Sequence, residues 1–432
     1  MRNVLAALWT CLVVSPALAV ELVIATVNNG HMITMQRLAA QFERAHPGVT
    51  LKWVTLEEGA LRQQVSRDIA TRGGRFDVMT IGLMEAPIWG RRGWLHPITP
   101  DPAWDVDDLL PGIRQGLSVE GRLYAAPFYG ESSMTMARAD LLKAAGLSLP
   151  ARPTWDQIRL LASRLHNPAK GVSGICLRGK PGWGENMSLI TTMANTMGGQ
   201  WFDMGWRPQL TSAPWRSAVS LYIELMRQWG PPGAVANGYN ENLALFSAGK
   251  CALWIDATVA GAFVEQPRLS SVAGQVVFAQ APVARTPKGS HWLWSWALAV
   301  PVGSRQPVVA QAFVKWATSR EYIRLVAAQN GWGAVPSGTR SSTYANADFM
   351  KANPYARVER EAIATANPGD ATLPRSPYTG IQFAAIPEFQ AIGTAVGQEI
   401  STLLVEGGEV DAALARAQQA AERKMRAAHY LR

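Results

Sequence analysis

Apolar positions along the chain change repeatedly between continuous runs and a helical repeat. Residues 21–27 (ELVIATV) form a β-branched run that ends in the turn sequence NNG, which predicts a strand and a turn. Apolar side chains between 35 and 42 then recur at helical spacing. The segments 49–56 (VTLKWVTL), 61–69 and 76–82 (FDVMTIG) predict a second strand, a second helix and a third strand. Strands that alternate with helices in this way indicate an α/β fold with a mostly parallel sheet.

A different pattern follows at 123–138 (LYAAPFYGESSMTMAR), where two extended segments meet with no helix between them. Such a passage can carry the chain from one domain to another. The stretches 292–301 (WLWSWALAVP) and 331–336 (GWGAVP) have the same character and predict further crossings. At 432 residues the chain exceeds the size at which one hydrophobic core keeps growing, so two domains are expected.

The first residues, MRNVLAALWTCLVVSPALA, have the features of a secretory signal peptide: one basic residue, an apolar run and a small-residue cleavage site near Ala19. The segment 1–19 is therefore expected to be removed, leaving a protein that folds in water outside the cytoplasm. No later run keeps about 18 apolar residues together, so no transmembrane helix is predicted. The net charge is +9, but the basic residues are scattered, which favours a solvated surface over a nucleic-acid groove.

Two cysteines, Cys176 and Cys251, remain after removal of the leader. An oxidising compartment permits them to form a disulfide. Two buried free thiols are also consistent with the sequence, because spacing along the chain does not show proximity in space.

The motifs of several enzyme classes are missing from the sequence, which has no G-x-S-x-G, H-E-x-x-H, C-x-x-C or Walker lysine loop. No nucleophilic triad, metal site or cofactor is therefore predicted. The loop 179–184 (GKPGWG) lies between a predicted strand and helix, where phosphate-binding loops occur. Its glycines have the order G-x-x-G-x-G, and Glu185 would repel an anion at that helix N-terminus, so a nucleotide site is not expected.

Aromatic and polar residues gather at the ends of the predicted strands, where open α/β sheets hold their ligands. These residues are Asn28, Asn29, Glu85, Trp89, Tyr129, Glu131, Trp183, Glu185, Asn186, Trp254, Asp256, Trp292, Trp294 and Trp296. A polyhydroxylated ligand needs this mixture, because its C–H faces stack on aromatic rings while its hydroxyls bond to carboxylates and amides.

Each candidate also has a purely structural interpretation. A tryptophan is usually buried, which favours core roles for Trp89, Trp254 and Trp296. Glu185 and Asn186 suit the first turn of a helix as well as they suit ligand contact. Asp256 is equally consistent with a helix cap, and Glu131 with a solvated turn charge.

Trp183 is the exception, because it lies between Gly182 and Gly184 and has little neighbouring bulk to pack against. We expect this ring to face a ligand rather than to belong to a core. On this interpretation Trp183→Ala leaves the melting temperature of the ligand-free protein nearly unchanged.

Taken in order, the motifs FYGES (128–132), GWGEN (182–186) and GKCALWIDAT (249–258), with the return WSWALAVP, resemble the sugar-binding proteins of ABC importers. The likeness runs over essentially the whole mature chain. It is greatest to the mannitol- and sorbitol-binding branch of the extracellular solute-binding family, which has a maltose-binding-protein-like fold. Each motif alone is weak, whereas their order is fairly specific.

The resemblance implies two α/β lobes that are built from discontinuous segments and close on a hinge over a ligand. By similarity the first lobe comprises 20–131 plus 295–334, and the second 132–294 plus 335–432. The family's ligand-binding positions correspond to Asn28, Tyr129, Glu131, Trp183, Glu185, Asn186, Asp256, Trp292 and Arg340. Arg178 could equally form a structural ion pair.

The resemblance also implies how the protein works. It would be a periplasmic monomer without enzymatic activity that captures a polyol such as mannitol, sorbitol or arabitol and delivers it to the permease subunits of an ABC importer. Contacts shared by both lobes would exist only in the closed form, so that binding favours closure.

Two other hypotheses use the same residues. A secreted carbohydrate-active enzyme would use Glu131 and Glu185 as acid and base, which requires a fixed separation of the two carboxyl groups. A binding protein for another ligand, such as an oligosaccharide or an amino acid, would arrange the aromatic and charged residues differently; an amino acid requires an arginine for its carboxylate.

Overall fold

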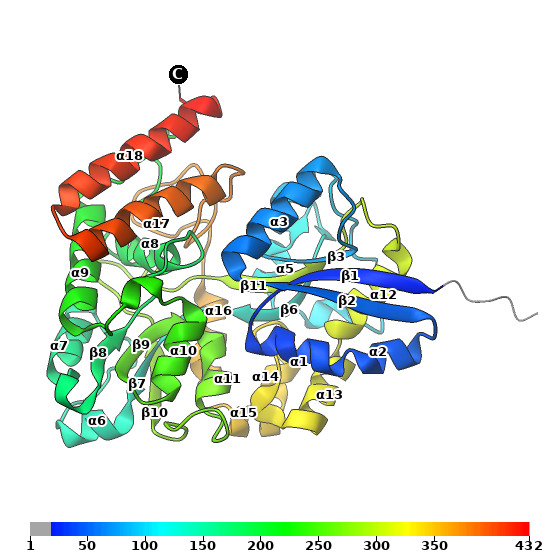
Figure 1. The fold of residues 1–432 in the computed structure, drawn as a ribbon, viewed down its shortest axis with the longest axis horizontal. Helices are drawn as coiled ribbons and strands as arrows, with labels where there is room; N and C mark the ends of the chain where they lie inside the picture. Colours follow the sequence, from blue (N-terminus) through cyan, green and yellow to red (C-terminus); the bar gives the residue numbers. More distant parts are fainter. Residues whose placement is uncertain (1–18, 100, 432) are drawn as a thin grey trace, which may run out of the picture.

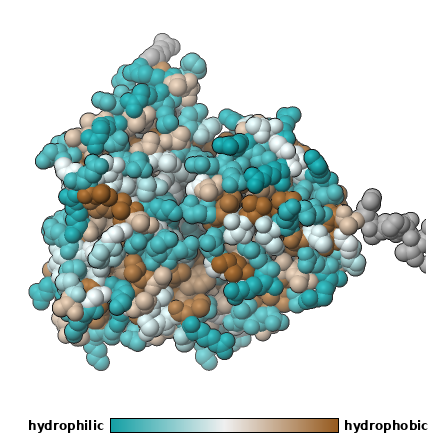
Figure 2. Space-filling view, in the orientation of Figure 1, coloured by the Kyte–Doolittle hydropathy of each residue, from teal (hydrophilic) through white to brown (hydrophobic). Residues whose placement is uncertain are grey.

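The computed structural model describes residues 19–99 and 101–431, so most of the expected signal peptide lies outside the described residues. Two separate β-sheets, each with its own helices, divide the molecule into two lobes that lie side by side (Figure 1). The view in Figure 2 shows hydrophilic side chains over most of this face, with the hydrophobic ones in small separate patches.

The first sheet has five strands in the order β2-β1-β3-β11-β6. Their bounds are β1 Val20–Val27, β2 Val49–Leu56, β3 Val78–Ile81, β6 Ala126–Glu131 and β11 Trp294–Ala299. The helices on this side are α1 Gly30–Leu38, α2 Ala40–Ala45, α3 Glu58–Thr71, α4 Glu85–Arg91, α5 Pro111–Gly116, α12 Pro307–Ala317 and α13 Arg320–Asn330. A short hairpin, β4 Ser118–Val119 with β5 Arg122–Leu123, precedes β6.

The second sheet has four strands in the order β10-β7-β9-β8. Their bounds are β7 Ser133–Arg138, β8 Ser173–Cys176, β9 Cys251–Ala257 and β10 Val276–Gln280. The helices on this side are α6 Ala139–Ala144, α7 Trp155–Leu165, α8 Asn186–Thr196, α9 Ala213–Trp229, α10 Tyr239–Ser247, α11 Gly261–Val264, α16 Ala356–Thr365, α17 Phe389–Glu406 and α18 Val410–Ala427. Short helices α14 Ser341–Ala345 and α15 Ala347–Ala352 follow the last crossing, and 3₁₀ turns are η1 Val106–Asp108, η2 Pro168–Lys170, η3 Ala234–Ala236, η4 Thr258–Ala260 and η5 Trp332–Ala334.

Both sheets are mixed, so the prediction of a mostly parallel sheet was wrong. The pairs β1–β2, β1–β3 and β8–β9 are parallel, whereas β11 is antiparallel to both β3 and β6, and β7 is antiparallel to both β9 and β10. The reason is the crossings. β6 runs directly into β7 of the other sheet, and β11 later returns to the first sheet, so these strands are not joined by the crossover helices that make neighbours parallel.

Local sequence signals mark where two of the helices begin. Thr154 and Gln157 form a capping box at the start of α7, since each side chain bonds to the other residue's backbone N–H. Asn29 caps α1 by accepting a hydrogen bond from the N–H of Met32. Asn29 thereby fixes the turn after β1, which is one of the strand ends that face the other lobe.

Candidate functional site

A cavity of about 160 Å³ lies between the two lobes. Its lining comes from the end of β1, the start of α3, the end of β6, the loop between β8 and α8, the start of α10 and the segment through β11. The residues on it include Asn28, Asn29, Glu57, Glu58, Arg62, Tyr129, Glu131, Arg178, Lys180, Trp183, Glu185, Ser188, Tyr239, Asn240, Trp292, Trp294, Trp296 and Gln382. Six of the nine expected binding residues are therefore brought together: Asn28, Tyr129, Glu131, Trp183, Glu185 and Trp292.

The lobes touch each other directly around this cavity. Lys180 Nζ of the β8–α8 loop lies 2.7 Å from Glu57 Oε1 at the start of α3. Asn240 Nδ2 at the start of α10 donates a hydrogen bond of 3.0 Å to the carbonyl of Asn28, after β1. Residues of both lobes thus enclose the same small space, and a molecule held there would contact both.

Arg178 is the central cation of the site. Its Nη2 lies 2.6 Å from Asp256 Oδ1, and its Nε donates to both Asp256 oxygens at 3.1 and 3.0 Å. Its Nη1 donates a hydrogen bond of 2.7 Å to the carbonyl of Gly184, which anchors the loop that carries Trp183. Burial acts to lower the pKa of Arg178, but Asp256 reverses this and raises it well above the usual range. Arg178 is both a structural ion-pair partner and part of the cavity lining.

Two carboxyl groups, Glu131 and Glu185, face the cavity from opposite lobes and are less than one-tenth exposed. Burial raises the pKa of Glu131 to about 8; Arg178 opposes this shift and Asp256 adds to it. Burial likewise raises the pKa of Glu185 to about 8, again opposed by Arg178. Removing water thus favours the neutral form of both groups, unless a ligand supplies hydrogen bonds to the charged form.

Four cavity-lining residues have a buried polar atom without a hydrogen-bond partner among the described residues: Glu185 Oε2, Trp183 Nε1, Tyr239 Oη and Gln382 Oε1. Of these, Glu185 Oε2 also lies in a longer ion pair, 3.6 Å from Arg178 Nη1. Buried polar groups are nearly always paired, and an unpaired one costs about 1–3 kcal/mol. These atoms comprise two acceptors, a donor and a hydroxyl that can be either. A ligand rich in hydroxyl groups could satisfy all three types.

The aromatic wall comes mainly from one strand segment. Trp292, Trp294 and Trp296 all line the cavity, because alternate residues of an extended chain point to the same face. Tyr129, on the paired strand β6, has its hydroxyl hydrogen-bonded to Asn29 Nδ2 at 2.9 Å. Trp296 was assigned to a core from sequence; it is 5% exposed, yet it also lines the cavity.

Trp183 is also packed more tightly than expected from its glycine neighbours, because it is only 3% exposed. Its ring makes edge contacts with Trp294 of β11 and with Phe383 and Phe389, at centroid distances of 5.5, 5.8 and 6.1 Å. The expectation that this ring is not core was therefore wrong in part. The glycine that follows it serves another purpose: a side chain at Gly184 would collide with the carboxylate of Glu58 across the cleft.

Arg62, which the sequence analysis did not single out, lies over this aromatic wall. Its Cζ is 4.1 Å from the ring centre of Trp183, 4.8 Å from that of Trp294 and 4.7 Å from that of Trp296. Nη1 pairs with Glu85 at 2.7 Å, and Nη2 pairs with Glu58 at 2.9 Å. No sequence motif surrounds Arg62, and only its position on α3 brings it to the site.

Three expected binding residues do not line the cavity. Asn186 is fully buried and donates hydrogen bonds to the carbonyl of Gly397 and to Ser401 Oγ, so it joins α8 to α17. Asp256 is fully buried beneath Arg178, whose charge it balances, and it also accepts from the N–H of Ala257.

Arg340 is fully buried away from the cavity, in a pocket of backbone carbonyls. It donates to the carbonyls of Thr318, Asp105 and Trp104, and it pairs with Asp108 at 3.3 Å. These partners belong to the expected first lobe, so Arg340 fastens the chain there after the last crossing.

Other residues were missed or weighed differently from sequence. Glu57, Glu58, Lys180, Tyr239, Asn240 and Gln382 all line the cavity without having been named. The first two follow the strand β2, so a search of every strand end would have found them. Tyr239 and Gln382 follow no strand, and sequence alone offers no signal for them. Trp89 and Trp254 are buried and do not line the cavity, as a core role predicts.

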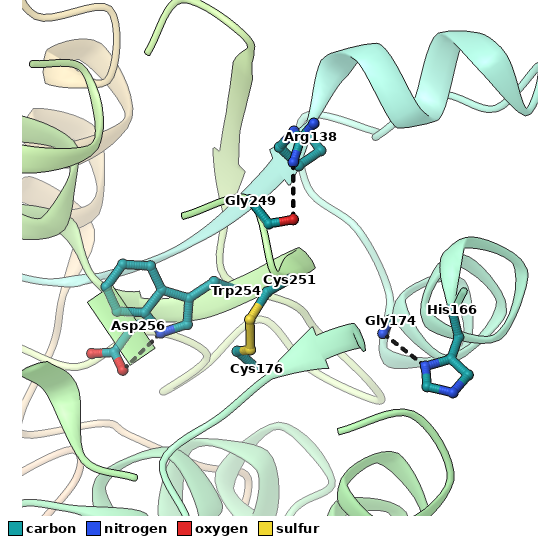
Figure 3. The surroundings of a disulfide bond; sticks show 8 residues. All are labelled: Arg138, His166, Gly174, Cys176, Gly249, Cys251, Trp254 and Asp256. Carbon is teal, nitrogen blue, oxygen red and sulfur yellow. Dashed lines mark hydrogen bonds between the residues drawn. A yellow bond between two sulfur atoms is a disulfide. The ribbon is translucent and has the colours of Figure 1, made fainter. Parts of the chain in front are cut away.

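Cys176 and Cys251 are joined by a disulfide that connects β8 to β9 (Figure 3). Trp254 is the register partner of Cys176 on the neighbouring strand and donates a hydrogen bond from Nε1 to Asp256 Oδ2 at 3.2 Å. The disulfide thus fastens the two strands that carry Arg178 and Asp256 into the site.

Within residues 19–99 and 101–431, no cluster of three or more metal-ligating side chains occurs. In the same part of the chain, none of the helices has the length and apolar character needed to span a bilayer.

The geometry described so far is that of a two-lobed binding protein, and comparison with known proteins identifies its family. The model of the bacterial extracellular solute-binding proteins matches residues 29–323, and the chain belongs to this family. The Mannitol-binding protein of Pseudomonas aeruginosa is 52% identical over 413 residues, which are 95% of this chain and 94% of that protein.

Two solved structures have the same fold. An ABC transporter solute-binding protein from Agrobacterium vitis S4, with bound D-mannitol, is 53% identical and has a TM-score of 0.93, covering 95% of this chain and 99% of that one. A second, from Agrobacterium radiobacter K84 in complex with ribitol, is 25% identical with a TM-score of 0.83, covering 94% and 99%.

Proposed function

We propose that this protein captures a linear polyol of the mannitol type in the cavity between its lobes and delivers it to the permease of an ABC importer outside the cytoplasm. The observation that carries the proposal is the set of buried polar atoms without a hydrogen-bond partner on a small aromatic-lined cavity: Glu185 Oε2, Trp183 Nε1, Tyr239 Oη and Gln382 Oε1. The likeness to the mannitol-bound protein of A. vitis, at 53% identity, supports the same ligand class.

In this proposal the carboxylates of Glu131 and Glu185 accept hydrogen bonds from ligand hydroxyls, and Arg178, whose Nη1 lies 3.6 Å from Glu185 Oε2, offsets part of their charge. The rings of Trp292 and Tyr129 cover the carbon chain, Trp183 donates a hydrogen bond from Nε1, and the exposed Asn28 contributes its amide. Asn186, Asp256 and Arg340 have no ligand contact here and act by holding the surrounding elements.

We further propose that the lobes are 20–131 plus 295–334 and 132–294 plus 335–432, closing on a hinge where the chain crosses. The change of sheet between Glu131 and Ser133 supports the first boundary. Trp294, which already belongs to β11, moves the second boundary one residue earlier. The hydrogen bonds of Arg340 to carbonyls of the first lobe move the last boundary beyond residue 340. Because both lobes supply ligand contacts, a bound polyol would favour the closed arrangement.

The enzyme hypothesis receives less support from the electrostatics. A pair of carboxyl groups that divides acid and nucleophile roles has pKa values pushed apart by different environments. Glu131 and Glu185 are instead both raised, each to about 8, by the same cause. The family's binding proteins, of which the P. aeruginosa relative is one, also favour capture without turnover.

A thermal-shift screen of the mature protein tests the proposal, because a ligand that binds the native state raises the melting temperature. The panel comprises mannitol, sorbitol, arabitol, monosaccharides, disaccharides and amino acids. We expect a clear shift with at least one linear polyol and none with a disaccharide. A shift with a disaccharide and with no polyol would refute the assignment.

A further inference from the structure

A side chain of the protein itself covers three tryptophan rings of the cavity, those of Trp183, Trp294 and Trp296, which together form a cage. Arg62 places its guanidinium within 5 Å of the ring centres of Trp183, Trp294 and Trp296. A cation this close to an aromatic face is attracted by the ring's negative face. The three rings that could have stacked against a sugar therefore have a guanidinium on them.

The position of Arg62 is fixed from behind by two acidic residues of the same lobe. Its Nε and Nη2 donate to Glu58 Oε1 at 3.1 and 2.9 Å, and its Nη1 donates to Glu85 Oε1 at 2.7 Å. Glu85 is itself held in place, because its Oε2 accepts a hydrogen bond from the N–H of Gly82. Residue 82 has no room for a side chain, since the ring of Trp294 fills that space. Arg62 is 6% exposed, so it is a fixed part of the wall.

The guanidinium of Arg62 has five N–H groups, and three of them donate hydrogen bonds to the carboxylates of Glu58 and Glu85. The other two are without a hydrogen-bond partner among the described residues, and Arg62 lines the cavity. A ring sugar stacks a C–H face on an aromatic ring, and here the guanidinium covers those aromatic faces, whereas a linear polyol needs mainly donors and acceptors along its chain.

We propose that Arg62 is a specificity-determining residue: by filling the cage formed by Trp183, Trp294 and Trp296, it excludes ring sugars from that end of the cavity and leaves room for a linear polyol. This inference rests on the proposed function and adds to it the residue that separates linear from cyclic ligands. The cage spans both lobes, since Trp183 precedes α8 while the other two rings lie on β11, so it is complete only when the lobes meet.

The test uses the variant Arg62→Ala/Glu85→Gln, which empties the cage without leaving the buried Glu85 charge unpaired. Dissociation constants for mannitol and for methyl α-glucopyranoside are measured by calorimetry on the full mature chain. We expect the preference for mannitol over the glucoside to fall at least tenfold. If the substitutions only disturb the structure, binding of both ligands weakens by the same factor and the ratio of the two dissociation constants stays unchanged. That result would overturn the inference.

Two further variants complete the design. Arg62→Lys keeps the cation and its acidic partners but lacks the planar guanidinium that covers three rings, so we expect the preference for mannitol over the glucoside to fall by at least threefold. This variant tests the inference independently of whether the double variant folds. Arg67→Ala removes an exposed arginine from the same helix and should keep the wild-type ratio. An unchanged ratio in Arg62→Lys argues against the role of Arg62. If wild-type protein binds no polyol, the proposed function fails and this inference falls with it; if wild type binds mannitol and only the ratios stay constant, this inference alone fails.

Discussion

Closure of the empty cleft should depend on pH through the buried carboxyl group of Glu131. In the arrangement described here this side chain is 7% exposed, so burial removes most of the hydration it would have in an open cleft. Burial raises its pKa from 4.5 to about 8, opposed by Arg178 and reinforced by Asp256, Glu58 and Glu359. The closed form without ligand therefore binds a proton more tightly than the open form does.

The sign and size follow from linkage. A group whose pKa is raised in the closed form stabilises that form fully below about pH 4.5, and this contribution is lost as the pH rises towards 8. Raising the pH from 5 to 7 makes empty closure less favourable by about 2.5 kcal/mol through Glu131 alone, or roughly 70-fold in the closed-to-open ratio. Glu185, with a pKa of about 8, acts in the same direction.

The measurement is the radius of gyration of the ligand-free protein by small-angle X-ray scattering between pH 5 and 8.5, with tryptophan emission as a second signal. We expect a more compact protein at pH 5, and a smaller pH dependence in Glu131→Gln, whose amide does not titrate. Glu321→Gln, at a side chain 67% exposed, is the matched control and should behave as wild type. A radius that is constant over this pH range, or a full wild-type response in Glu131→Gln, would refute the reasoning.

Two further predictions concern stability. Asp256→Ala leaves the buried cation of Arg178 without its partner, and we expect it to lower the free energy of unfolding by about 3–5 kcal/mol in urea titration; a loss below about 1 kcal/mol would show that the pair is not needed. Trp183→Ala removes a ring packed on Phe383 and Phe389, so we now expect loss of the polyol response together with loss of stability. A loss of about 3–5 kcal/mol lowers the ligand-free melting temperature by about 6–10 °C, at roughly 2 °C per kcal/mol. Trp183→Phe should recover part of that stability. An unchanged melting temperature of Trp183→Ala would restore the sequence-based expectation.

Much of the fold could be predicted from local pattern. The strand 49–56 matches β2 residue for residue, and the local pair Thr154 and Gln157 forms the capping box that starts α7. These features depend on side-chain periodicity and on hydrogen bonds between near neighbours, and a short stretch of sequence is enough to determine both. The sheet was misjudged because strand direction depends on which distant strand pairs with which, and β11 joins the first sheet after more than 160 residues spent elsewhere.

The candidate site divides in the same way. Strand ends led to Glu131, Tyr129 and Trp292, because the ends of strands face the cleft in this architecture. They did not separate Glu185 from its neighbour Asn186, although one lines the cavity and the other bonds to α17. Adjacent residues at a helix start point in different directions, and only the packing partners decide which of them reaches the ligand space.

What the sequence by itself determined is the kind of protein: alternating strands and helices, extended crossings, and aromatic and acidic residues at the strand ends. What only the tertiary structure decided is which charged side chains pair with each other and which aromatic rings can contact a ligand. Arg178 and Asp256 meet across 78 positions, and Arg62 covers tryptophans more than 100 residues away. The physical reason is that electrostatic and ring contacts depend on distances of a few ångströms, which the chain sets only once both lobes have folded and met.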